Sequence, residues 1–218
     1  MRKIFEIIKG KLTPPSICLN LSRKKAEELI NKLGPYAKIL DLGSGTRRLA
    51  PYIINLDLYT LPNVDVVGNG CILPFKNESF NAVIVTAVLE HTPQPAMVVN
   101  EILRVLRTGG YVYAEAPFIQ AYHPDLEDYS RFTLTGINYL FRNFEKLESG
   151  ICVGPTSALC GIFQVYISVL IDIPLLRSII YHAVGWLCFF IKYLDIWLAL
   201  KKKSHVISSG FWFYGKKP

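Results

Sequence analysis

Apolar residues recur at helical spacing in two stretches at the start of the chain. In residues 1–12 they share one face and basic residues lie off it, which predicts a short amphipathic helix. A second helix is predicted over residues 22–33, with Ser22 as its N-cap and Gly34 after its last turn. We therefore expect residues 1–34 to form an N-terminal helical segment.

Short apolar runs then alternate with helical patterns. Strands are predicted at residues 37–42, 52–57, 64–68, 81–88, 111–116, 146–153 and 206–214. A helical stripe from Val99 to Leu106 is expected to end at Gly109 and Gly110, and a further helix is predicted over residues 133–144. Such alternation is typical of an α/β fold with a doubly wound, mostly parallel sheet of the Rossmann-like type.

Residues 155–203, between the last two predicted strands, form a strongly apolar insert. Residues 156–200 contain only four charged side chains: Asp172, Arg177, Lys192 and Asp195. The two uncharged runs, residues 156–171 and 178–191, are each shorter than the roughly 20 residues of a membrane span, so they predict a helical hairpin. Lys201 to Lys203 follow it directly, and lysines that flank apolar segments often extend to lipid headgroups. The insert is thus a membrane-interface element, or a lid, or the face of a homodimer.

Composition narrows the class of protein. The chain has 218 residues, of which 51% are hydrophobic and 19% charged, with a net charge of +7. This excludes a disordered tail and a coiled coil. Both ends are basic and the middle is mildly acidic, so the ends either contact anionic lipid or nucleic acid, or simply keep the chain soluble. We expect no nucleic-acid partner, because the basic ends are not accompanied by a track of stacking aromatic residues in the core.

Cysteine usage and the N-terminal stretch bear on location. The five cysteines are scattered, without CxxC or zinc spacing, which predicts free thiols, a reducing compartment and no metal site. Glu6 and Lys9 interrupt the first apolar stretch, so it does not resemble a signal peptide. We expect a cytoplasmic protein that binds peripherally to the inner face of the membrane.

Glycine and acidic residues follow the first two predicted strands, where ligands bind in doubly wound sheets. Gly43 and Gly45 would let the backbone approach a ligand closely. Asp41 would meet a cation and repel a phosphate, and Arg48 stands where GxGxxG needs a third glycine. Both observations disfavour a dinucleotide. Asp57 suits the two hydroxyls of a ribose, although a turn cap is the alternative.

The third predicted strand is followed by Asn69 and Gly70. The Asn69 amide could pair with the edge of an adenine, with Ile72 and Leu73 against its face; the alternative is a simple Asn-Gly turn.

Five segments in order resemble class I S-adenosylmethionine-dependent methyltransferases of the type 11 group: KILDLGSGT, INLD, NGCILPFKNESFNAVIV, VLEHTPQP and EILRVLRTGGYVYAEAP. The resemblance covers roughly residues 36–145. It implies a seven-stranded sheet whose last strand is antiparallel, and S-adenosyl-L-methionine as the cofactor.

The resemblance also implies roles for individual residues. The methionine end of the cofactor would lie against Asp41, Gly43 and Gly45, the ribose against Asp57 and the adenine against Asn69. The end of the fourth strand would lie beside the cofactor through Thr86, Ala87 and Val88. Three features depart from the family pattern: Asn69 and Asn81 stand where aspartate is usual, and the first two crossovers are too short for full helices.

Two histidines are candidates for a catalytic base, since histidine titrates near neutral pH. His91 follows the fourth strand, and its alternative role is loop packing. His123 follows the fifth strand; we favour it as the base, with Asp128 or Tyr129 orienting it. The alternative for this group is a network of caps and ion pairs that holds the loop.

These features predict an enzyme that transfers methyl groups from S-adenosylmethionine to an oxygen of a small or lipid-linked acceptor. A second hypothesis is a methyltransferase-like protein that binds the cofactor without catalysis, which Asn69 and the short crossovers allow. An NAD-dependent oxidoreductase and a nucleic-acid methyltransferase are less favoured.

Overall fold

The computed structural model describes residues 21–123 and 127–218. The amphipathic helix predicted over residues 1–12 lies outside these ranges. Contacts divide the described chain into two compact units. The sheet unit holds residues 22–118, 122–152 and 210–218, and the hairpin unit holds residues 119–121 and 153–209. Each unit is described by itself below.

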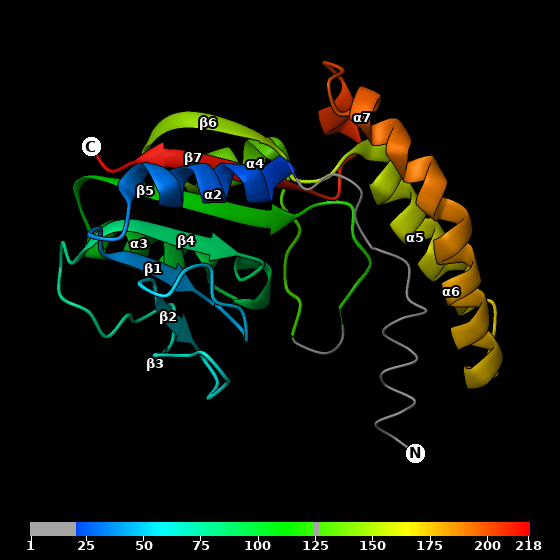
Figure 1. Cartoon of the computed structure of the whole chain (residues 1–218), viewed down its shortest axis with the longest axis horizontal. Helices are drawn as coiled ribbons and strands as arrows, with labels where there is room; N and C mark the ends of the chain where they lie inside the picture. Colours follow the sequence, from blue (N-terminus) through cyan, green and yellow to red (C-terminus); the bar gives the residue numbers. More distant parts are fainter. Residues whose placement is uncertain (1–20, 124–126) are drawn as a thin grey trace. The chain divides into compact units, whose positions relative to one another are not determined.

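A seven-stranded sheet forms the centre of the sheet unit, in the order β3-β2-β1-β4-β5-β7-β6 (Figure 1). Its strands are β1 (Ile39–Leu42), β2 (Ile54–Asp57), β3 (Val66–Val67), β4 (Phe80–Thr86), β5 (Leu106–Pro117), β6 (Glu145–Ile151) and β7 (Gly210–Lys216). The pairs from β3 through β5 are parallel, and β7 is antiparallel to both β5 and β6. The predicted fold class and the antiparallel last strand are confirmed.

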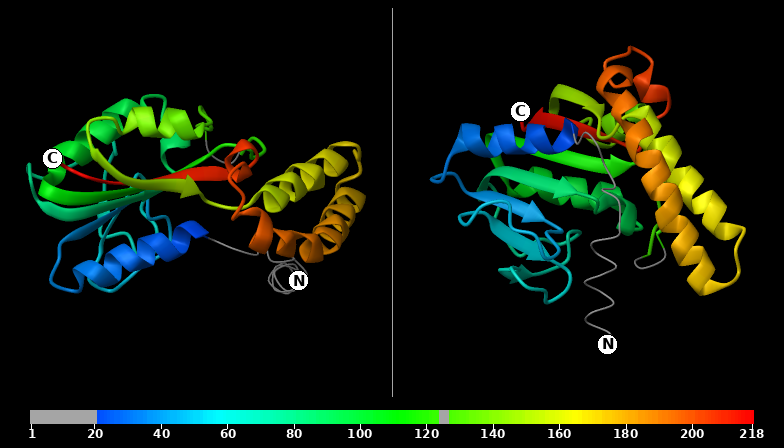
Figure 2. Two further views of the ribbon diagram at one scale, coloured as in Figure 1. Left: turned by 90° about the horizontal axis from the view of Figure 1, so that it is seen from above. Right: turned by 45° about the vertical axis from the view of Figure 1, so that its right-hand side comes forward.

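Helices cover both faces of this sheet, as a doubly wound fold requires. Helix α2 (Leu21–Leu33) lies on one face, and α3 (Pro95–Val105) and α4 (Leu134–Leu140) lie on the other (Figure 2). The core includes fully buried aliphatic side chains from β1 and β4, because strands covered on both faces have no solvated side, and fully buried aromatic side chains from β5 and β7.

Two local predictions were wrong. Helix α2 already includes Leu21, so Ser22 lies inside it and is not the N-cap. Gly109 and Gly110 lie within β5 and do not end a helix, because β5 already pairs with β4 at Leu106. A register shift follows that pair, and Gly109 takes a φ of +77°, which glycine tolerates without strain.

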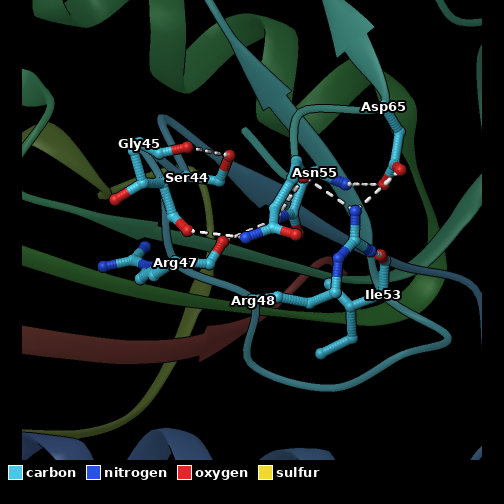
Figure 3. Close-up of polar contacts among 9 residues, drawn as sticks. Ser44, Gly45, Arg47, Arg48, Ile53, Asn55 and Asp65 are labelled. Carbon is cyan, nitrogen blue, oxygen red and sulfur yellow. Dashed lines mark hydrogen bonds and ion pairs between the residues drawn. The ribbon is translucent and has the colours of Figure 1, made fainter. Parts of the chain in front are cut away.

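The predicted shortness of the first two crossovers is confirmed, since residues 43–53 and 58–65 contain no helix. Hydrogen bonds between the loops stand in for the missing helices (Figure 3). Arg48 donates to the carbonyl of Ile53 and to a carboxylate oxygen of Asp65, 3.0 and 2.7 Å away. Asn55 donates its side-chain amide to the carbonyls of Arg47 and Asn63. These bonds fix the loops around the ends of β1 and β2.

The hairpin unit confirms the predicted helical insert between β6 and β7. Helices α5 (Pro155–Val169) and α6 (Pro174–Ile191) pack side by side, and α6 continues through a short 3-10 turn into α7 (Asp195–Leu198). Residues Pro174–Leu198 form a helix that is long and apolar enough to cross a bilayer, with a mean hydropathy of 1.5.

A buried aspartate closes the base of this hairpin. Both carboxylate oxygens of Asp195 accept hydrogen bonds from the first turn of α5, from the backbone N–H groups of Thr156 and Ser157 at 2.8 and 2.9 Å. A Cβ at Gly154 would lie only 2.4 Å from the Asp195 carboxyl carbon, so only glycine fits there. Asp195 therefore supplies the cap that the sequence of α5 lacks.

Candidate functional site

A cavity of about 740 Å³ opens at the carboxyl ends of β1, β2 and β4 in the sheet unit. This is the size of a site for a small molecule or cofactor, and the place where doubly wound sheets bind ligands. Eight of the predicted site residues line it: Gly43, Gly45, Asp57, Asn69, Gly70, Ala87, Val88 and His91. The sheet thus brings together residues from four separate segments.

The turn after β1 forms one wall of the cavity. Gly43 and Gly45 have φ angles of +69° and +57°, in the left-handed region that favours glycine. A Cβ at Gly43 would also come within 2.1 Å of a Val88 methyl carbon. The backbone N–H groups of Gly43 and Ser44 both donate to the carbonyl of Leu56, which ties this turn to β2. Backbone therefore forms this wall with no side chain in the way.

Asp57, the last residue of β2, is anchored by two backbone donors. One carboxylate oxygen accepts from the N–H of Gly45 at 2.9 Å, and the other accepts from the N–H of Tyr59 at 3.1 Å. The turn-capping role that was the alternative is therefore real. Each carboxylate oxygen still has a free lone pair, so the same side chain can accept bonds from two ligand hydroxyls.

Asn69 also combines a turn with the cavity wall. Its side-chain oxygen accepts from the N–H of Cys71 at 2.8 Å, which closes an Asx turn. This oxygen keeps one lone pair and the amide keeps its two N–H donors, so the group can still meet the edge of a purine.

Three predicted cofactor residues lie outside the cavity wall. Asp41 is fully buried and accepts two hydrogen bonds from the Arg47 guanidinium, at 3.0 and 2.6 Å. Burial raises the pKa of the Asp41 carboxyl, while Arg47 acts in the opposite direction. Leu73 is buried in the core, and its N–H donates to Glu101. Thr86 has a buried hydroxyl that finds no partner among residues 21–123 and 127–218.

The cation expected beside Asp41 is Arg47, which the sequence alone does not single out. The available signal is a basic residue six positions after the aspartate, just after the glycine turn.

The two histidines lie in different surroundings. His91 is in the short helix η1 (Leu89–His91), lines the cavity, and its Nδ1 lies 2.8 Å from the carbonyl oxygen of Glu127. His123 does not line the cavity; its side chain is 49% exposed and its Nδ1 lies 3.5 Å from a carboxylate oxygen of Asp128.

Asp128 and its neighbours form the predicted ion-pair network. The Arg131 guanidinium contacts both carboxylate oxygens of Asp128, and the backbone N–H of His123 donates to one of these oxygens at 3.0 Å. Arg131 thereby holds the pKa of Asp128 far below its usual range. Tyr129 donates its hydroxyl to Glu127 and its backbone N–H to the carbonyl of Glu90. This network fixes the loop that presents Glu127 to the cavity.

Comparison with known proteins decides the family. Residues 51–114 match the family model described as a methyltransferase domain. Over 105 residues the chain is 31% identical to the demethylmenaquinone methyltransferase of Lactococcus lactis. This alignment covers 48% of this chain and 40% of that protein. The chain contains a class I methyltransferase domain of the type 11 group. It spans less than half the length of this curated relative.

Solved structures show the same fold for this chain. The [4+2]-cyclase SpnF aligns over 89% of the chain and 81% of its own, at 16% identity and a TM-score of 0.55. The 1,6-didemethyltoxoflavin-N1-methyltransferase of Burkholderia thailandensis, solved with S-adenosylhomocysteine, aligns over 91% and 79% at 15% identity and a TM-score of 0.54. The cyclase shows that this fold also carries other chemistry, so activity must be argued from the site.

S-Adenosylmethionine, the cofactor of this methyltransferase family, suits the residues present. The cavity has room for it, the glycine turn leaves backbone exposed, and Asp57 has lone pairs for ribose hydroxyls. Among residues 21–123 and 127–218, no group of three histidine, cysteine or acidic side chains could hold a metal ion.

Proposed function

We propose that this chain transfers the methyl group of S-adenosylmethionine to a hydroxyl oxygen of a small or lipid-linked acceptor. One observation carries the proposal: a single cavity holds both Asp57, which suits the cofactor ribose, and His91, which suits proton removal from an acceptor. The cofactor, when bound, supplies an electrophilic methyl group. The rest of the chemistry falls to residues of the cavity wall.

Two residues would hold the nucleoside part of the cofactor. Asp57 would accept hydrogen bonds from the ribose hydroxyls, and Asn69 would meet the adenine edge. Both side chains are already fixed by backbone N–H groups, so little conformational freedom is lost on binding. The glycine turn would lie against the methionine part, where a side chain at Gly43 would clash.

His91 is the better placed of the two histidines to act as a base. A carbonyl oxygen can only accept a hydrogen bond, so the contact with Glu127 requires the proton on Nδ1. The lone pair of neutral His91 is then on Nε2. If an acceptor hydroxyl is positioned at Nε2, this nitrogen can take the hydroxyl proton while the hydroxyl oxygen attacks the methyl group. This is the step at which a base helps oxygen methylation.

Glu90 supports this assignment. Its carboxyl is buried, one of its oxygens lies 3.9 Å from His91 Nε2, and the other has no hydrogen-bond partner in the described part of the chain. Burial raises the pKa of the Glu90 carboxyl. A carboxylate here gains a partner when His91 becomes charged, so Glu90 would stabilise the imidazolium formed during turnover.

A methyl-transfer assay with histidine variants tests the proposal. The assay incubates tritiated S-adenosylmethionine with the enzyme and with separated membrane and cytosol fractions as acceptor sources. We expect label in a lipid or small-molecule product. His91→Asn should lower the rate roughly 100-fold or more, while affinity for S-adenosylhomocysteine changes less than about twofold.

His123→Asn is the matched control and should retain most of the rate. If His123→Asn removes activity and His91→Asn does not, the base is His123. If the wild-type chain binds S-adenosylhomocysteine but labels neither fraction, it is a cofactor-binding protein without methyl transfer, and the proposal is wrong.

A further inference from the structure

The outer faces of α5 and α6 carry a dense set of exposed apolar side chains. On α5 they include Leu159, Phe163 and Tyr166. On α6 they include Leu187 and Phe190, which are 68% and 73% exposed. Soluble monomers rarely leave an apolar patch of this extent in water, so the face needs a partner.

Several polar side chains of the hairpin bond to backbone carbonyls of the hairpin itself. The Ser168 hydroxyl donates to the carbonyl of Val165 at 2.7 Å, and the Gln164 amide donates to the carbonyl of Tyr181 at 2.8 Å. His182 Nδ1 lies 2.6 Å from the carbonyl oxygen of Ser178. A segment that enters hydrocarbon must satisfy its polar groups internally in this way, because water is absent there.

Charges lie near the ends of the hairpin or are buried inside it. Asp172 and Arg177 are next to the turn between the helices, whereas Lys192 and Asp195 are buried. Exposed lysines 201–203 follow α7 at the other end. Tryptophan and lysine often meet at membrane interfaces, and here Lys201 Nζ lies 4.0 Å from the centre of the Trp197 ring.

The lengths of the helices also fit a bilayer. At 1.5 Å per residue, α5 and α6 are about 22 and 27 Å long. The hydrocarbon core is about 30 Å thick. The long uncharged middle of the hairpin can therefore lie in hydrocarbon while both ends reach the headgroups.

We propose that the α5–α6 hairpin inserts into a lipid bilayer and that lysines 201–203 bind its anionic headgroups. A bilayer suits this surface better than a second copy of the chain. The exposed apolar residues of α6 from Leu175 to Ile191 spread over roughly 240° of its circumference, at 3.6 residues per turn. One packed helix would cover only part of that arc, whereas lipid covers all of it. This inference does not depend on methyl transfer.

Vesicle flotation of the full chain tests the inference, because floating separates vesicle-bound protein from aggregates. Vesicles of neutral lipid are compared with vesicles that also contain anionic lipid. We expect the chain to float with the anionic vesicles and to stay partly bound at high salt, since salt does not screen apolar burial. Replacing lysines 201–203 with Gln should weaken binding about fivefold per charge at low salt.

A double variant tests the apolar face itself. Leu187→Glu with Phe190→Glu should weaken partitioning roughly 100-fold or more, because charged side chains enter hydrocarbon poorly. Tyr36→Glu with Leu147→Glu adds the same charge to exposed apolar residues of the sheet unit and should leave binding unchanged.

Two results would overturn the inference. The intact chain could remain with the unbound protein at low salt. It could also sediment as a dimer that the Leu187→Glu and Phe190→Glu variant dissociates, in which case a second copy covers the face. Methyl transfer is measured separately, so its absence would not affect either reading.

Discussion

At the scale of single residues, the cavity wall contains side chains that also hold its loops in place. Asp57 fixes the glycine turn through Gly45, and Asn69 fixes the next turn through Cys71. These internal bonds already fix the two side chains that we propose to contact the cofactor, which would lower the entropy lost on binding.

Removing the charge of Asp57 tests its ligand role. Asp57→Asn keeps the size of the side chain but loses charge-assisted acceptance, so affinity for S-adenosylhomocysteine should fall at least about tenfold in calorimetry. Asp65→Asn is the control, since Asp65 pairs with Arg48 in the adjoining loops and does not line the cavity. Equal losses in both variants would mean that loop integrity, and not the Asp57 charge, governs binding.

The sequence was informative about these residues for a geometric reason. Parallel strands end at one edge of a sheet, so residues directly after predicted strands, such as Asp57 and His91, must lie near one another. The Asp41–Arg47 pair could not be predicted in the same way, because Arg47 reaches Asp41 only through the particular turn that the intervening glycines take.

At the scale of elements, the sheet was predictable and its irregular points were not. Apolar runs located all seven strands, but β5 begins earlier than expected, at Leu106. The Gly109–Gly110 pair is typical of a helix end, and only pairing with β4 places it inside a strand. The loop containing Asp128 was predicted as a cluster; which histidine faces the cavity depends on how Arg131 and Tyr129 hold that loop.

The Asp128–Arg131 pair makes a pH-dependent contribution to stability. Arg131 lowers the pKa of Asp128 in the folded state, so this stability is present above the unfolded pKa, about 3.9, and is lost as pH falls below it. Asp128→Asn should therefore destabilise the fold at pH 7 by about 2 kcal/mol, a value typical of hydrogen bonds to a charged group, since the pair is only partly buried. In urea unfolding, the difference from wild type should narrow below about pH 4. A difference that is constant with pH would point to packing alone.

At the scale of the whole molecule, the cavity and the exposed apolar helices belong to different units. Every residue that lines the cavity belongs to the sheet unit, and the exposed apolar helices belong to the hairpin unit. The hairpin enters the chain between β6 and β7, which are direct antiparallel neighbours. An insertion at that point leaves the pairing of the sheet intact, as insertions between adjacent strands generally do.

This arrangement predicts that the sheet unit folds and binds cofactor without the hairpin. Ile151 pairs with Phe211, and the N–H of Cys152 donates to the carbonyl of Gly210 at 2.8 Å, so a short Gly-Ser turn can replace residues 154–208. The shortened chain should bind S-adenosylhomocysteine within about twofold of the intact chain, because its cavity wall is complete and a tenfold change would need 1.4 kcal/mol. It should also no longer float with anionic vesicles. Circular dichroism checks that the sheet has formed. A folded variant that has lost cofactor affinity would show that the hairpin contributes to the site, whereas a folded variant that still floats would place membrane binding elsewhere in the chain.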